Sequence, residues 1–247
     1  MRSDKGNALF LILIAVALFA ALSYAITNSS RGSSSTDKEQ AEIQAGEILN
    51  YFAAVQNEFN RLRVINGIPA YNINFSNDNT HLSLSTGTGT GTSSGPYGNN
   101  PNCTAPIADC SIFKERGGNL ISRAFYDTAI TPIPDSNGHA VPGEFRVYNN
   151  FIEDVGSNSE PELLMVITGL KDEVCDALNR KLDLPLASSQ PDVNSIAIGV
   201  REYYNKASNY AARLPGAATG YIGQNAFCAK ILHGYYGNLF YYAVHIE

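Results

Sequence analysis

The feature that most constrains this chain is an apolar stretch close to its N-terminus. From Ala8 to Leu22 every residue is apolar, and no charged residue occurs between Lys5 and Arg31. As a helix, residues 8–26 would be about 28 Å long, close to the hydrocarbon thickness of a bilayer. A helix satisfies its own backbone hydrogen bonds, so it is the form in which such a segment can lie in lipid. The remaining residues are expected to form one body attached to this helix.

Residues alone leave more than one interpretation of this N-terminus open. A secretory signal peptide would use Arg2 and Lys5 as its basic start and Ser23-Tyr24-Ala25 as its cleavage site, although Tyr24 is bulky for that role. An uncleaved signal anchor would instead keep the helix and place the body outside the cytoplasm. In a third case a very short leader is removed and the apolar helix is retained.

The third interpretation comes from a resemblance. Lys5-Gly6 followed directly by Asn7-Ala8-Leu9-Phe10-Leu11-Ile12 resembles the type IV pilin and pseudopilin family. The resemblance implies that a prepilin peptidase cuts after Gly6 and that Asn7 becomes the methylated first residue of the mature chain. The first mature residue of the family is commonly Phe or Met, and the fifth is usually Glu, where this chain has Leu11. A subunit without that Glu resembles the minor pilins or pseudopilins at a filament tip.

Length and charge restrict the function classes. About 210 of the 247 residues remain beyond the apolar helix, enough for one sizeable core or two small ones. Only 16% of residues are charged and the net charge is −6, without a cluster of Lys and Arg. Nucleic-acid binding needs such a cluster to neutralise phosphates, so no nucleic-acid partner is expected. The composition suits an extracytoplasmic, β-rich body.

Four cysteines, an even number, suggest disulfides in a body exported to an oxidising compartment. No C-x₂-C pair and no histidine at a ligand spacing support zinc, so no metal and no cofactor is expected. Four cysteines allow three connectivities. We favour Cys103–Cys110, which closes a small loop, together with Cys175–Cys228, which would join two distant segments.

The expected organisation has four parts: a leader at 1–6 and a transmembrane or filament-core helix at 7–27, as the resemblance implies, then a flexible polar linker at 28–36 and a globular head at 37–247. Thr36-Asp37-Lys38-Glu39 has the form of a capping box and predicts a helix start. The helix should end near Asn66-Gly67, before Pro69. Its apolar residues recur at steps of four and three, which predicts one buried stripe: Ala41, Ala45, Ile48, Phe52, Val55, Phe59 and Leu62.

The head beyond this helix should be an antiparallel sheet. Strands are expected near residues 71–75, at 145–152, at 163–168 ending at Gly169, and at 239–246. Residues 171–182 predict a short amphipathic helix, and 193–210 favour a helix over a strand. The stretch 167–182 also resembles a segment in the heads of some type IVb-like pilins. The Gly/Thr tract at 85–95 should be a surface loop. The expected fold class is therefore α+β, with disulfides in the head.

The tyrosine-rich C-terminal third is a candidate binding surface, represented by Tyr203, Tyr204, Tyr235 and Tyr236. Tyrosine combines a large apolar face with a polar tip, which suits sugar or protein ligands as well as ordinary core packing. No catalytic motif of recognised spacing occurs, and the four histidines are scattered. An enzyme is the least supported class.

The expected function is structural: a pilus-like or pseudopilus subunit, of the minor or tip type, held in the inner membrane before assembly with a periplasmic head and on the cell surface afterwards. Its partners would be other pilin subunits and the prepilin peptidase. The alternative is a membrane-tethered or secreted binding module, adhesin-like or lectin-like, that recognises a surface glycan or a protein.

Overall fold

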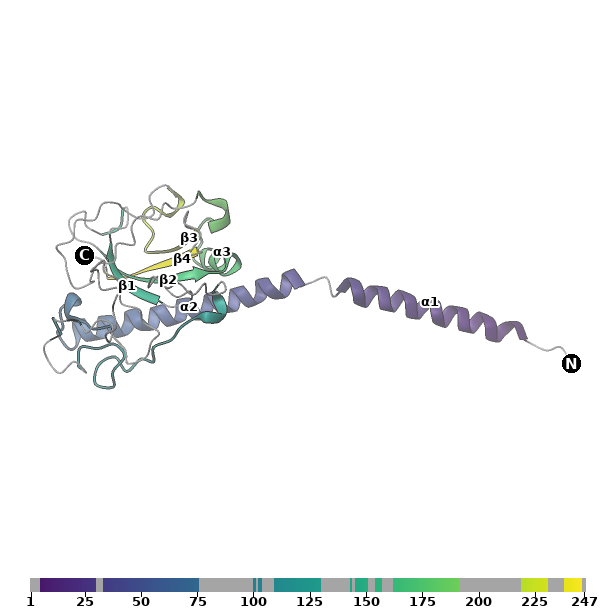
Figure 1. Ribbon diagram of the computed structural model, residues 1–247, viewed down its shortest axis with the longest axis horizontal. Coiled ribbons are helices and arrows are strands. Elements are labelled where there is room, and N and C mark those ends of the chain that lie inside the picture. The colour runs from purple at the N-terminus through teal and green to yellow at the C-terminus, as the bar shows by residue number, and fades with distance from the viewer. Residues whose placement is uncertain are drawn as a thin grey trace, which may run out of the picture. The chain divides into compact units, whose positions relative to one another are not determined.

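A computed structural model describes most of the chain and divides it into two compact units, residues 1–40 and 41–247 (Figure 1). Each unit is considered by itself. The described residues are 5–29, 33–75, 100, 102–103, 109–129, 143, 145–150, 154–156, 162–191, 219–230 and 238–245.

The first unit contains the predicted apolar helix. Helix α1 runs from Lys5 to Ser29, so the helix expected at residues 7–27 is present. It bears no charged side chain after Lys5, because the apolar run leaves none. All of the side chains from Phe10 to Tyr24 are exposed within the chain.

Helix α2 extends from Ser33 to Val64, which corrects the predicted start at Thr36 by three residues. Once a helix is nucleated by packing, each added residue gains a hydrogen bond at little cost, so it extends through the preceding serines. The linker predicted at 28–36 is helical at both ends, and residues 30–32 lie outside the described part of the chain. At the other end the chain turns at Gly67, whose φ of +67° suits glycine.

The predicted stripe of α2 is confirmed, because all seven of its residues are buried. They belong to one hydrophobic core with residues of the sheet. Phe52 lies at the centre of this contact, with its ring centroid 5.5 Å from that of Phe240 and 5.6 Å from that of Tyr242. The Tyr242 hydroxyl also donates a hydrogen bond to Oε1 of Gln56 (2.8 Å). Helix α2 therefore packs on the protein's own sheet.

The sheet of the described residues has four antiparallel strands in the order β1-β2-β4-β3. The strands are β1 (Phe145–Asn150), β2 (Glu162–Leu170), β3 (Ala226–Lys230) and β4 (Asn238–His245). Helix α3 (Asp172–Lys181) follows β2, as predicted. Short 3₁₀ turns occur at Ala70–Asn72, Tyr126–Thr128, Ala187–Ser189 and Thr219–Tyr221. The α+β fold class is thus confirmed.

The two faces of the sheet contribute to different cores. In β2, Leu163, Met165 and Ile167 join the core that contains the buried residues of α2 and α3. Leu164 and Val166 join a second core with residues of β3 and β4 on the other face. All nine residues of β2 are buried, which explains its apolar run from Leu163 to Ile167.

Three local predictions differ from the structure. Gly169 does not end β2 but lies at a register shift with φ of +75°, and the strand continues to Leu170. Residues 71–75 form a 3₁₀ turn and a single bridge from Asn74 to Ser111 rather than a strand. Strand β3 was not predicted, because five residues give too short a pattern. The predicted segments 85–95 and 193–210 lie outside the described residues.

We predict that Phe52→Ala destabilises the head by about 3–5 kcal/mol, because the deletion leaves a cavity between α2 and the sheet. Ile43 on the same helix is 65% exposed and provides a matched control. The Ile43→Ala variant should change the free energy of unfolding by less than about 0.5 kcal/mol. Denaturant unfolding of the full chain in detergent measures both. Equal effects at the two positions would contradict the packing described above.

Candidate functional site

The residues of the predicted processing site lie in the first turn of α1. The backbone of Gly6 and Asn7 is helical there, and the side chain of Asn7 lies outside the described part of the structure. Cleavage after Gly6 therefore stays a prediction.

Most of the large apolar side chains that the described chain exposes lie on α1. Phe19 is 72% exposed, and the other large side chains on every side of the helix are also exposed: Phe10, Leu11, Ile12, Leu13, Ile14, Val16, Leu18 and Leu22. A helix that is apolar all round is normally buried against something else. Among the described residues, no helix meets the combined requirement of length and hydropathy for crossing a membrane.

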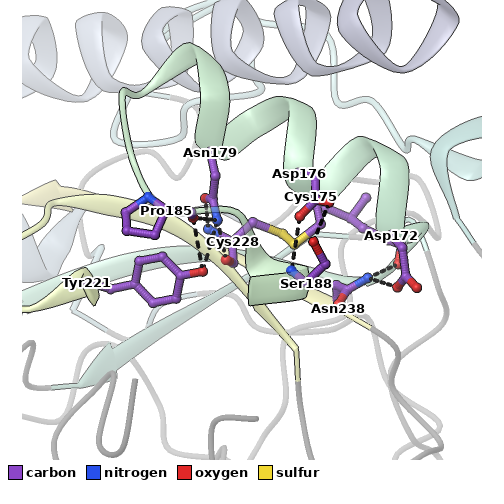
Figure 2. Close-up of a disulfide and its surroundings, with 10 residues drawn as sticks. Asp172, Cys175, Asp176, Asn179, Pro185, Ser188, Tyr221, Cys228 and Asn238 are labelled. Carbon is purple, nitrogen blue, oxygen red and sulfur yellow. Dashed lines mark hydrogen bonds between the residues drawn. A yellow bond between two sulfur atoms is a disulfide. The ribbon is translucent and has the colours of Figure 1, made fainter. Parts of the chain in front are cut away.

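Both predicted disulfides are present. Cys103–Cys110 spans seven residues, and Cys175–Cys228 spans 53 and joins α3 to β3 (Figure 2). Cys175 and Cys228 are fully buried, and their Cα atoms are 5.3 Å apart. The second bond therefore fixes a helix on one face of the sheet to the strand at its edge.

A buried amide lies beside this second disulfide. The side chain of Asn179 donates from Nδ2 to the carbonyl oxygen of Cys228 (2.8 Å), and its Oδ1 accepts the N–H of Cys228 (2.8 Å). The same Nδ2 lies 3.0 Å from the carbonyl oxygen of Pro185 and 3.1 Å from the hydroxyl of Tyr221. Asn179 thus joins α3, the segment after it and β3 through one group (Figure 2).

Two further contacts hold α3 at the same end of the sheet. Nδ2 of Asn238, in β4, donates to the carbonyl oxygen of Leu170 (3.0 Å) and to Oδ1 of Asp172 (2.7 Å). The carboxylate of Asp176 accepts from the N–H (3.1 Å) and the hydroxyl (2.8 Å) of Ser188. The amide of Asn238 is buried and needs these partners, whereas the contact between Asp176 and Ser188 is exposed.

The smaller disulfide also has buried asparagines beside it. Asn100 donates from Nδ2 to the carbonyl oxygens of Tyr71 (2.7 Å) and Ile73 (3.0 Å), and its own carbonyl accepts the N–H of Cys103 (3.0 Å). The N–H of Asn74 donates to the carbonyl oxygen of Cys110 (2.8 Å). Each half of this disulfide is therefore hydrogen-bonded to a buried asparagine.

Two described tyrosines of the C-terminal third, Tyr221 and Tyr241, lie in the core. Tyr221 is buried and stacks on Phe227, with ring centroids 5.1 Å apart, and Tyr241 is buried on the same face. The predicted binding-surface residues, Tyr203, Tyr204, Tyr235 and Tyr236, lie outside the described residues.

Little in the described part of the chain points to catalysis. No group of three or more metal-ligating side chains occurs among the described residues. The side chains of His81, His139, His233 and His245 lie outside that part. A hollow of about 520 Å³ at the end of α2, lined by residues 63–64 and 67–72, has only one arginine and one tyrosine as titratable groups.

The role of Asn179 could not be assigned from the sequence, because its partner Cys228 is 49 residues away. One signal was available. Asn179 follows Cys175 by four residues, so the two must share a face of the predicted helix, and a polar residue on a buried face needs a partner.

Replacing Cys175 and Cys228 together with Ser should lower the free energy of unfolding by about 4 kcal/mol, because the 53-residue loop is no longer restricted in the unfolded chain. The matched variant of Cys103 and Cys110 opens a seven-residue loop and should lose only about 2 kcal/mol. Denaturant titration compares the two variants. An equal loss in both, or a larger one for the small loop, would contradict this expectation.

A second prediction concerns alkaline pH. Burial raises the pKa of Tyr221 to about 12, against the partly opposing hydrogen bond from Asn179. The folded protein then holds this proton more tightly than the unfolded chain, so stability falls as pH rises from about 10 to about 12. Burial also raises the pKa of Tyr51 and Tyr242, so these two residues contribute to the same loss of stability at alkaline pH.

The Tyr221→Phe variant has no proton to lose at this position. Its stability curve should therefore be less steep than that of the wild type, by up to about 1.4 kcal/mol per pH unit. Unfolding measured at pH 9, 10 and 11 separates this change of slope from the constant cost of the lost hydroxyl. Parallel curves for the two proteins would show that Tyr221 does not titrate in this range.

Comparison of this chain with known protein families, with curated proteins and with solved structures finds no match. The function must therefore be argued from the helix surface, the head and the N-terminal residues themselves.

Proposed function

We propose that this protein is a structural subunit of a type IV pilus-like filament or pseudopilus, of the minor or tip type. The observation that carries the proposal is helix α1, whose large apolar side chains are exposed on every side. Exposing such a surface to water raises the free energy of the chain by about 25 cal/mol for each Å². Burial of α1 by lipid or by neighbouring subunits removes that cost.

The N-terminal residues favour the core of a filament as the place where α1 is finally buried. Lys5-Gly6 before the apolar run resembles a prepilin leader, and cleavage there would leave the whole helix on the mature chain. Leu11 occupies the position at which the family usually has Glu, so α1 places no carboxylate in an apolar bundle. An unpaired charge would be costly there. This neutral helix supports a minor or tip position.

The head adds independent support for a place outside the cytoplasm. Both disulfides are formed, and such bonds persist in oxidising compartments. Helix α2 packs on an antiparallel sheet, and the two share the larger of the two hydrophobic cores of the head. The membrane stage of this proposal depends on the sequence, in which residues 8–22 are apolar without interruption.

In this mechanism the subunit waits in the inner membrane after the prepilin peptidase has removed residues 1–6. Assembly transfers α1 from lipid into a bundle with the helices of other subunits. Because both surroundings are apolar, the transfer conserves most of the dispersion contacts of the helix. The head remains outside.

The proposal predicts that Gly6→Val blocks processing, because a narrow peptidase site must accept an extended backbone at the residue before the cut. The unprocessed protein should be six residues heavier than the wild type and still inserted. Intact mass spectrometry of the purified protein measures this. If the mass of the wild-type protein corresponds to a chain that begins at Met1, the proposal is contradicted and the helix is an uncleaved anchor.

Ala25→Arg is the matched variant for the competing signal-peptide hypothesis. Arginine at this position should block a signal peptidase that cuts after Ala25. A retained helix should tolerate the change, because an arginine near a helix end can extend to the membrane interface. A wild-type protein that begins at Ile26, with a mass insensitive to Gly6→Val, would identify a secreted protein instead.

A further inference from the structure

We propose that Asn179 is a positioning residue for disulfide formation: its side chain holds strand β3 on helix α3 before the sulfur atoms of Cys175 and Cys228 are joined. In this way it selects one of the possible cysteine pairings. The inference does not depend on the proposed filament function.

The geometry supports this order of events. Cys175 and Asn179 are four residues apart in α3 and so lie on the same face of the helix, one turn from each other. Asn179 binds both the N–H and the carbonyl oxygen of Cys228, at 2.8 Å each. When these two bonds form, Cys228 is placed opposite Cys175, with the Cα atoms 5.3 Å apart. That separation is within the range a disulfide requires.

The hydrogen bonds of Asn179 do not need the disulfide. They join a side-chain amide to backbone atoms, and neither sulfur atom takes part. β3 is the last strand in the order β1-β2-β4-β3, so the side-chain amide pairs with its outer edge as the peptide of a further strand would. Asn179 is fully buried, and its bonds are correspondingly costly to leave unmade.

Four cysteines create a choice that this arrangement resolves. Cys103 and Cys110 are hydrogen-bonded to Asn100 and Asn74 in another part of the head. Those bonds join backbone atoms, whereas Cys228 is held by the side chain of Asn179. A chain without the Asn179 contacts would leave Cys228 free to meet Cys103 or Cys110 while the thiols are reduced.

The chemistry requires a disulfide oxidant, for which glutathione disulfide is the probe. The thiolate of one cysteine attacks glutathione disulfide, forming a mixed disulfide and releasing one glutathione thiolate. The second cysteine thiolate then attacks the protein sulfur of that mixed disulfide. The Cys175–Cys228 bond forms, the second glutathione leaves, and two electrons and two protons have passed to glutathione. Asn179 acts in the second attack, because it brings the two sulfur atoms together.

The test is reoxidation of the full chain in detergent. The protein is reduced, transferred to a glutathione redox buffer at pH 8, quenched by alkylation at intervals and mapped by mass spectrometry. In the wild type, Cys175 should re-form its bond with Cys228. In Asn179→Ala, the rate should fall about tenfold or more, as expected for losing buried hydrogen bonds. Bonds from Cys228 to Cys103 or Cys110 should also appear.

Asn238→Ala is the matched control. Asn238 is also buried and also fixes α3, through Leu170 and Asp172, but it makes no hydrogen bond to Cys228. Its variant should reoxidise at the wild-type rate and with the wild-type pairing. An equal slowing in both variants would reduce Asn179 to a general stabilising role and overturn the proposal. A wild-type rate in Asn179→Ala would overturn it as well.

A measurement without any substitution at Asn179 decides the matter if that variant does not fold. In the doubly substituted Cys175→Ser, Cys228→Ser protein, the backbone amide at position 228 should remain protected from hydrogen exchange by at least about 100-fold, as a buried bonded amide is. This amide donates to Asn179 rather than to β4, so its protection from exchange directly reports the hydrogen bond to Asn179. Loss of that protection would show that the disulfide orders the asparagine, and the proposal would be wrong.

Discussion

The head depends on the contact between α2 and the sheet. The helix provides a stripe of seven buried residues, and Phe52 packs between Phe240 and Tyr242 of the central strand β4. Without this contact the sheet would expose an apolar face and α2 would have no reason to remain helical, because most helices owe their stability to packing. Helix α3 lies on the same face and completes the core. The two helices are also joined at the surface, where Glu42 of α2 lies 2.8 Å from Nε of Arg180.

Around this apolar contact, buried asparagines join segments of the head that are distant in the sequence. Asn100 binds the chain at Tyr71 and Ile73, Asn179 binds β3, and Asn238 binds the end of β2. An asparagine side chain carries a peptide-like amide, so it can satisfy backbone groups that no neighbouring strand reaches. Such groups would be expensive to bury unpaired. The two disulfides therefore lie within hydrogen-bonded surroundings that already define their positions.

The sequence was informative where a pattern was long and local. The stripe of α2 was predictable because seven apolar positions repeat at a helical period, and β2 was predictable from its apolar run. The observed pair of disulfides was the favoured one of the three connectivities that four cysteines allow. The sheet order was beyond reach, because β2 pairs with β4 about 75 residues along the chain, and no local pattern encodes such a register. Strand β3 is short, and the Asn179 network depends on contacts between distant residues. The candidate surface tyrosines lie outside the described residues, whereas Tyr221 is buried, with partners for its hydroxyl inside the head.

The covalent loop closed by Cys175 and Cys228 limits how far the chain can be extended by a mechanical load. If a load were applied between the two ends of the chain, the residues outside the loop could be drawn out once the core yielded. The 53-residue interval could not, because the S–S bond carries the tension past it. At about 3.4 Å per extended residue, roughly 180 Å of contour length is withheld. β3 and α3 would stay covalently joined in the stretched chain, and the head could re-form from this joined pair when the tension is released.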